Sequence, residues 1–307
     1  MSERNAELAS FLRSRRQRLT PEQVGLPQSA RRRIATLRRE DVAWLADVGI
    51  TWYTWLEQGR PIKMAADTLE RIGAALRLDP SETEYLHKLV HTRGRDHTHE
   101  QDVVDERVSA VVHSFTEGYA FVMCARWDVL VWNERYGELM QLGDPPDRAR
   151  KGLWFMFNDA QAKRSYPNWD PSARDMVAAF RVAYADYVGD AGFEKLIREL
   201  AVSSAVFAAI WAEVGVLSMN RWNVGDIRDP RSGGVAKFET VSLALPDAPG
   251  QTLVFHVPAD VPSEAPAEFF GTLHGSGAPP ARCAKRPDAR RDWQRRYYAT
   301  ANKFSTS

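Results

Sequence analysis

The chain has 307 residues, which is long enough for two domains. Its shares of hydrophobic residues (44%) and charged residues (26%) are ordinary for a globular protein and exclude a disordered or fibrous chain. No apolar run reaches the ~18 residues of a membrane span. The two cysteines lie too far apart for a ligand-spaced pair, which argues against a disulfide framework and a cysteine-based zinc site. We therefore expect a cytoplasmic protein with no membrane partner.

The net charge of +1 hides an uneven distribution. Residues 1–95 hold 17 Lys and Arg against 12 Asp and Glu, and the ten basic residues before position 40 are all arginines. The planar guanidinium group suits phosphate, so this excess favours a nucleic-acid partner. A solvated basic surface is the alternative interpretation.

The first 92 residues predict short helices. "AELASFLRSRRQRL" places Leu8, Phe11, Leu12 and Leu19 on one helical stripe and the arginines on the other face. A second helix starts near Leu37, "DVG" interrupts it, and a third helix covers about residues 50–58. Two helices joined by a three-residue turn predict a helix-turn-helix. "MAADTLERIGAALRL" and "DPSETEYLHKLVHT" predict two further amphipathic helices.

Helical spacing divides the residues of the third helix between two faces. Tyr53 and Leu56 face inward, and Trp44 on the preceding helix is also expected in the core. The opposite face enters the major groove, as the second helix of this motif does, and arginines beside the motif reach phosphates or a narrow minor groove. The expected DNA-binding residues are Arg31, Arg32, Arg33, Arg38, Arg39, Ile50, Thr51, Trp52, Trp55 and Arg60.

After a polar linker at residues 93–104, the pattern changes. "EGYAFVMCARWDVLVWN" predicts a hairpin that ends at Asn133, a helix cap. Helices dominate from residue 134 to 214, and "SMNRWNV", "AKFETVSLAL" and "QTLVFHVP" predict three strands. The result is an α+β layer with helices on one face of an antiparallel sheet. Residues 258–287 are expected to be loosely structured, and "DARRDWQRRYYATANK" predicts a last helix.

The second domain holds more aromatic surface than a small sheet with helices needs. A pocket for a small apolar or aromatic effector, fatty-acid-like or polyketide-like, is one interpretation, and simple filling of the core is the other. The expected ligand-binding residues are Phe121, Met123, Trp132, Phe155, Phe157, Phe207 and Trp211.

Other chemistry finds little support in the sequence. His87 and His91 lie four apart, with His97 and His99 close behind, but a polar helix end explains them better than a metal site does. There is no phosphate loop, serine nucleophile elbow or HExxH motif. We expect no catalytic residues, no metal and no cofactor, and therefore no enzyme.

The sequence resembles the MmyB-like transcription regulators. The resemblance is carried by "LASFLRSRRQRLTPEQVGLP", "RRRIATLRREDVAWLADVGITWYTWLEQGR", "RWDVLVWN" and "FNDAQAKRSYPNW". It implies a bacterial regulator with an Xre-type helix-turn-helix at residues 1–92, a linker at 93–104, a PAS-like α+β ligand-binding domain at 105–257 and an extension at 258–307. The turn departs from the family's Gly-Val-Ser, because Asp47 and Gly49 replace the Gly and the Ser.

Three functions remain open at this point. The first is a ligand-responsive regulator that binds double-stranded DNA as a homodimer. The second is a metabolic small-molecule-binding protein or enzyme with an incidental basic N-terminal domain. The third is an adaptor that binds a protein partner through Trp52 and Trp55.

Overall fold

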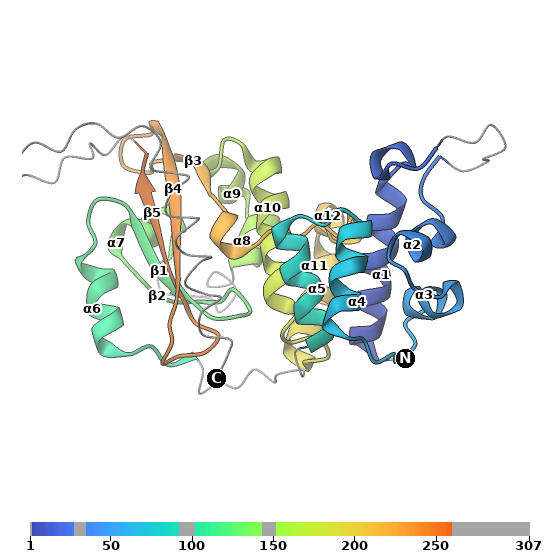
Figure 1. Ribbon diagram of the computed structural model, residues 1–307. Helices are drawn as coiled ribbons and strands as arrows, with labels where there is room; N and C mark the ends of the chain where they lie inside the picture. The colour runs from blue at the N-terminus through green and yellow to red at the C-terminus, as the bar shows by residue number, and fades with distance from the viewer. Residues whose placement is uncertain (1, 28–34, 92–101, 143–151, 260–307) are drawn as a thin grey trace, which may run out of the picture. The chain divides into compact units, whose positions relative to one another are not determined.

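A computed structural model of the chain describes residues 2–27, 35–91, 102–142 and 152–259 (Figure 1). Up to residue 91 the described chain is helical, as predicted. Its elements are α1 (Glu3–Arg18), the 3-10 turn η1 (Glu22–Val24), α2 (Arg39–Leu45), α3 (Ile50–Glu57), α4 (Ala66–Ala75) and α5 (Pro80–His91).

Helix α1 packs against α3 and α5 among the N-terminal helices. Ser2 caps it by accepting a hydrogen bond from the Asn5 amide at 3.3 Å. Three members of the predicted stripe, Leu8, Phe11 and Leu12, are buried, whereas Leu19 is the C-cap residue of α1 and is half-buried. The prediction that the arginines all lie on the other face is wrong, because Arg15 and Arg16 are buried as well.

From residue 102 on, the described chain forms a sheet and a second set of helices. Its helices are α6 (Glu106–Ser114), α7 (Glu134–Leu139), α8 (Gly152–Asn158), α9 (Ala160–Ser165), α10 (Trp169–Tyr184), α11 (Ala191–Ser203), α12 (Ala205–Ala212) and the 3-10 turn η3 (Met219–Arg221). Its strands are β1 (Tyr119–Met123), β2 (Val129–Trp132), β3 (Gly225–Arg228), β4 (Val235–Ala244) and β5 (Thr252–Pro258).

The five strands form one antiparallel sheet in the order β2-β1-β5-β4-β3. The predicted hairpin is β1 and β2, and Asn133 caps α7 by accepting from the Tyr136 amide. The strand predicted at "SMNRWNV" (residues 218–224) is wrong, because η3 occupies residues 219–221 and β3 begins only at Gly225, after the predicted segment ends. The α+β class is confirmed.

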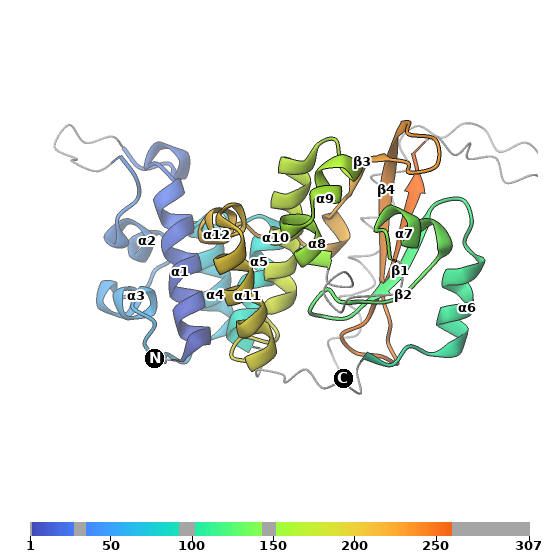
Figure 2. The same cartoon turned by 180° about the vertical axis from the view of Figure 1, so that it is seen from behind.

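Helices cover both faces of the sheet, whereas the sequence predicted one covered face. Helix α6 packs on one side, where Val112 meets Ala120, Val122 and Leu253. Figures 1 and 2 show α6 and α8–α10 on opposite sides of the strands. Helix α6 was not predicted, because it has only nine residues and directly follows the polar linker in the sequence. The face away from α6 carries Phe121, Met123 and the site described below.

Several predictions lie outside the described residues, among them residues 93–101 of the linker and the last helix at residues 288–303. Within the described ranges, no helix is both long enough and apolar enough to cross a membrane.

Candidate functional site

Helices α2 and α3 form the predicted helix-turn-helix. The Val48 amide donates to the Ala43 carbonyl at 2.9 Å and closes the turn. Asp47 has a φ of 52°, in the left-handed region that Asp tolerates better than most residues. Gly49 is the N-cap of α3 and has extended backbone. Both departures from the family's turn therefore fit the geometry.

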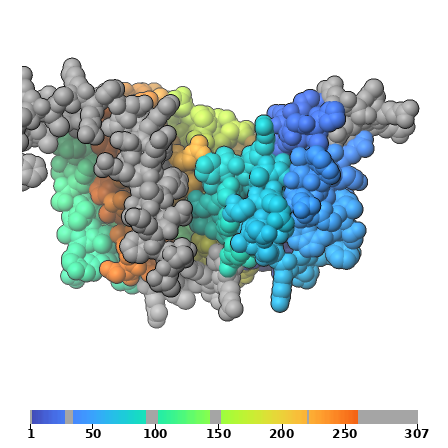
Figure 3. Space-filling model, in the orientation of Figure 1, coloured from blue at the N-terminus to red at the C-terminus, as the bar shows by residue number. Residues whose placement is uncertain are grey.

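Helix α3 presents the expected outer face. Tyr53 and Leu56 are buried, whereas Thr51 is exposed and Ile50 and Trp55 are each 41% exposed. Trp52, which was expected on this outer face, is instead half-buried and packs against the core. Figure 3 shows the blue residues of α2 and α3 at the surface of the molecule. The exposed surface of α3 therefore consists of two apolar side chains, Ile50 and Trp55, and the hydroxyl group of Thr51.

The expected arginine clamps have different surroundings. The Arg38 side chain is exposed at the N-cap of α2, and Arg60 lies over the Trp55 ring at 5.3 Å from its centroid. Arg39 donates its Nε to Glu57 Oε2 at 2.8 Å and is 40% exposed, so part of its guanidinium is already used inside the domain. Arg31, Arg32 and Arg33 lie outside the described residues.

The basic run of α1 serves the protein itself. Arg16 binds the fully buried Glu57 carboxylate with two hydrogen bonds of 2.6 and 2.9 Å. Arg15 pairs with Glu82 at 2.6 Å and donates to the Val214 carbonyl at 2.8 Å. Arg18 donates to the Glu213 carbonyl. These three arginines bind groups within the protein. The number of positive charges available to DNA phosphates is therefore smaller than the charge excess of the N-terminal residues suggests.

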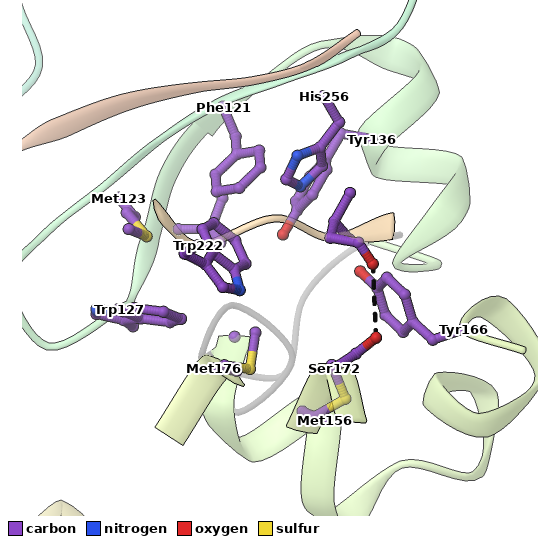
Figure 4. A pocket seen from close by; sticks show the side chains of 13 residues that line it. Phe121, Met123, Trp127, Tyr136, Met156, Tyr166, Ser172, Met176, Trp222 and His256 are labelled. Atoms are coloured by element: carbon purple, nitrogen blue, oxygen red, sulfur yellow. Dashed lines mark hydrogen bonds between the residues drawn. The ribbon is translucent and has the colours of Figure 1, made fainter. Parts of the chain in front are cut away.

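A pocket lies between the sheet and helices α7–α10 (Figure 4). Its walls are mostly aromatic rings and thioethers, and its free space is about 20 Å³, room for about one water molecule. A larger guest must displace side chains, and methionines rearrange readily. The lining residues are Phe121, Met123, Trp127, Val129, Tyr136, Gly152, Met156, Tyr166, Ser172, Met176, Trp222, Val224 and His256.

Among the described lining residues, His256 is the one imidazole. Thr240 Oγ1 accepts the Val224 amide at 3.0 Å and lies 3.0 Å from His256 Nδ1. The threonine proton is thus available to Nδ1, and we assign the ring proton to Nε2. Burial lowers the pKa of His256 to about 3, so the ring is neutral.

Two phenols add hydrogen-bonding capacity to the same pocket. Burial raises the pKa of Tyr136 and of Tyr166 well above the ordinary value for tyrosine, so both hydroxyls stay protonated. Tyr136 also stacks on Phe121, with 4.2 Å between the ring centroids. The described pocket is therefore apolar and uncharged, and it has a few groups that can donate a hydrogen bond.

Comparison with known families agrees with both parts. Residues 7–86 match a helix-turn-helix domain, and residues 104–268 match the MmyB-like transcription regulator ligand binding domain. The second match covers more than half of the chain. The chain belongs to the MmyB-like transcription regulators. Comparison with curated proteins gave no match. The two matched domains are those of a DNA-binding, ligand-responsive transcription regulator.

In this MmyB-like regulator, Phe121 and Met123 are the two expected ligand-binding residues that line the pocket. Trp132 is the last residue of the edge strand β2 and packs beside Gly137 of α7, away from the pocket lining. Phe155 is buried in the core. The other three belong to an aromatic cluster, in which the Phe207 ring lies 5.2 Å from Phe157 and 5.9 Å from Trp211.

The sequence reading missed most of the pocket's walls, including Met156, Met176, Trp222 and His256. One signal was available for His256. It lies two residues after Val254 on β5, and alternation places both on the same face of the sheet as Phe121. Helix residues such as Met176 carry no comparable signal, because buried methionines fill cores and pockets alike.

The expected position of Trp44 can be checked in this regulator. Trp44 was expected in the core but is 72% exposed. Val42, Ala43 and Ala46 form the buried face of α2, and Trp44 points away from it. His87 lies 2.9 Å from Glu70 and beside His91. No group of three or more potential metal ligands occurs within the described residues.

The low pKa of His256 leads to a prediction for acid stability. As the pH falls below 6.5, the unfolded chain takes up a proton here, whereas the folded chain stays neutral down to about pH 3. Stability is therefore lost as the pH falls through this window, by about 2 kcal/mol between pH 7 and pH 5. We expect His256→Gln to remove this part of the loss in urea unfolding at the two pH values. Exposed His113→Gln is the control and should retain it; equal losses in parent and His256→Gln would contradict the assignment.

Proposed function

We propose that this regulator is a homodimer that contacts double-stranded DNA with α3, and that a small apolar effector in the pocket alters this DNA binding. The proposal assigns DNA recognition to residues 1–92, the linker to 93–104 and effector binding to residues 105–257. The segment from 258 to 307 has no assigned role.

One observation carries the DNA half of the proposal. Tyr53 and Leu56 hold α3 in the core, and this leaves Ile50 and Thr51 facing outward at the start of the helix, with Trp55 one turn further on. That is the position from which a helix-turn-helix reads base edges. Apolar side chains there suit thymine methyl groups, and Thr51 can hydrogen-bond a base or a phosphate.

The pocket supports an apolar effector. Aromatic and thioether walls favour a hydrophobic guest, and His256 Nε2 together with the two phenols could donate hydrogen bonds to one or two oxygens. A groove of about 590 Å³ between α6 and the turn joining β4 to β5 is larger, but it is open to solvent and edged by Asp105, Arg107 and Asp247. We therefore assign the effector to the enclosed site.

The decisive test is binding of the full-length protein to DNA from upstream of its own gene across a salt series, with a scrambled duplex of equal length for comparison. We expect a specific complex whose log affinity falls steeply with log salt concentration. Equal and weak binding to both duplexes, together with failure to enrich any duplex from a random library, would overturn the DNA half of the proposal.

Two substitutions distinguish a residue that contacts phosphate from a residue that recognises bases. Arg38→Ala should weaken binding to all duplexes alike and reduce the salt slope by about 1, because one phosphate contact is lost. Thr51→Ala should instead change which duplex binds best, with a loss of about 1–3 kcal/mol at the preferred site. The exposed Arg164 on α9 provides an Ala control that should leave both unchanged. If Arg38→Ala and Thr51→Ala had the same effect, α3 would not be the reading helix.

A further inference from the structure

Helix α10 connects the pocket to the helices that carry the DNA-binding motif. Ser172 and Met176 on this helix line the pocket. Arg181, nine residues after Ser172 and thus about 14 Å further along the axis, reaches Glu7 on α1. At the end of the same helix, the Ala185 carbonyl accepts a hydrogen bond from Arg4 at 2.8 Å. One continuous helix therefore touches both the pocket and α1.

Arg181 makes three separate interactions between α10 and its neighbours. It is 2% exposed, it pairs with Glu7, and it donates to the Trp211 carbonyl. Its guanidinium also lies 3.7 Å from the centroid of the Trp211 ring. The buried Tyr85 of α5 donates to the same Glu7 oxygen at 2.5 Å. A buried charge held by a carboxylate, a carbonyl and a ring has one favourable position, so movement of α10 has to move its partners or break these contacts.

The C-terminal end of α12 makes the junction stronger. The carbonyls of Trp211, Glu213 and Val214 accept hydrogen bonds from Arg181, Arg18 and Arg15, respectively. Cations at this end of a helix are favoured by its dipole. Two of the three arginines come from α1, so α1 is fixed both to α10 and to the helix that packs against α10.

We propose that α10 transmits occupancy of the pocket to the DNA-binding helices through the Arg181–Glu7 contact. This inference rests on the proposed function, and it adds the route by which the effector acts. The pocket has room for about one water molecule in its present form, so a guest has to push its walls apart. Ser172 and Met176 are part of those walls, and α10 carries the displacement to α1, which packs against α3.

A substitution can stand in for the unidentified effector. Val129→Phe on β2 places a larger side chain in the pocket from the wall opposite α10, and Val224→Phe is the second variant if the first does not fold. Backbone hydrogen exchange of the full-length protein then reports on each helix. In the Val129→Phe protein we expect exchange to change in α10 and also in α1, the latter by about fivefold, at the lower end of allosteric coupling.

Glu7→Gln tests the contact itself. It removes the negative charge that pairs with Arg181 but keeps the size of the side chain. The amide oxygen that remains is a weaker acceptor for both Tyr85 and Arg181. Combined with Val129→Phe, it should leave the change in α10 intact and abolish the change in α1. Glu70→Gln, an exposed substitution on α4, is the matched control and should preserve both changes. Persistence of the α1 change in the Glu7→Gln background, or its absence when α10 does respond, would overturn the proposal.

The DNA measurement separates this inference from the proposed function. With the upstream duplex as probe, Val129→Phe should change the dissociation constant by about fivefold or more, and Glu7→Gln should suppress this change. If the parent protein binds no duplex specifically, the proposed function fails, while the exchange experiment still decides whether α10 couples the pocket to α1. If specific binding is present but indifferent to Val129→Phe, the coupling fails and the DNA-binding function stands.

Discussion

Replacing Glu57 by glutamine should destabilise the DNA-binding helices by about 3–5 kcal/mol, as expected when one partner of a buried ion pair is removed. The carboxylate is fully buried and accepts hydrogen bonds from Arg16 at 2.6 and 2.9 Å and from Arg39 at 2.8 Å. Glutamine leaves two guanidinium groups without their counter-charge, and one of them is itself buried. Because Glu57 ends α3 and Arg39 begins α2, DNA binding should be lost together with stability.

Urea unfolding followed by circular dichroism measures the effect. Glu70→Gln removes an exposed carboxylate that pairs with His87, and this control should cost less than about 1 kcal/mol. Burial by itself would raise the pKa of Glu57, but the hydrogen bonds and charges of Arg16 and Arg39 lower it below its ordinary 4.5. Its stabilising contribution is therefore present above pH 4.5 and lost as the pH falls below that value. The difference between parent and Glu57→Gln should shrink on acidification; a difference equal to that of Glu70→Gln at pH 7 would refute the prediction.

The N-terminal helices could be predicted well because their signals are local. The apolar stripe of Leu8, Phe11 and Leu12 and the short turn at Asp47 to Gly49 each lie within one or two helical turns. Trp44 shows where residue type misled the prediction. It is a large hydrophobic residue, but α2 has only two turns, and Val42, Ala43 and Ala46 already fill its buried face.

The role of the α1 arginines could not be predicted because their partners are distant in sequence. Arg15 meets Glu82 and the Val214 carbonyl, and Arg16 meets Glu57. In the sequence alone these residues read as one basic run, and such a run has the same composition whether it faces phosphate or buried carboxylates. Only the tertiary contacts separate the two, and they turn a candidate DNA surface into an internal junction.

The pocket shows the same limit for aromatic residues. Phe121, Met123 and Trp132 on the hairpin were predicted from their apolar bulk alone, and in the structure Phe121 and Met123, two residues apart on β1, share the face that lines the pocket. On α8, Phe155 and Phe157 were chosen by size, yet Met156 between them lines the pocket, while Phe157 packs edge-on against Trp169. Successive residues on a helix point about 100° apart, so the choice between them depends on how the helix is rotated against the sheet. The sequence does not give that rotation.

Asn133→Ala should cost about 3 kcal/mol or more, because each buried group left without its partner costs about 1–3 kcal/mol. Asn133 is 2% exposed and uses its full hydrogen-bonding capacity. Its Oδ1 accepts the amides of Ala120 and Tyr136 at 3.1 and 3.0 Å. Its Nδ2 donates to the carbonyls of Phe115 and Gly118 at 2.7 and 2.9 Å. This one side chain fixes the end of α6, the first strand and the start of α7 together.

A helix cap alone would give a smaller effect, and this makes the prediction decisive. Asp159 caps α9 by accepting the Gln161 amide at 2.7 Å and is exposed, so Asp159→Ala should cost about 1 kcal/mol. If Asn133→Ala costs no more than Asp159→Ala in urea unfolding, Asn133 is only a cap. A larger loss has a consequence for the pocket, because β1 carries Phe121 and α7 carries Tyr136, the two rings stacked at 4.2 Å in its wall. Asn133 then holds in place two elements on which effector binding depends, although it does not line the pocket itself.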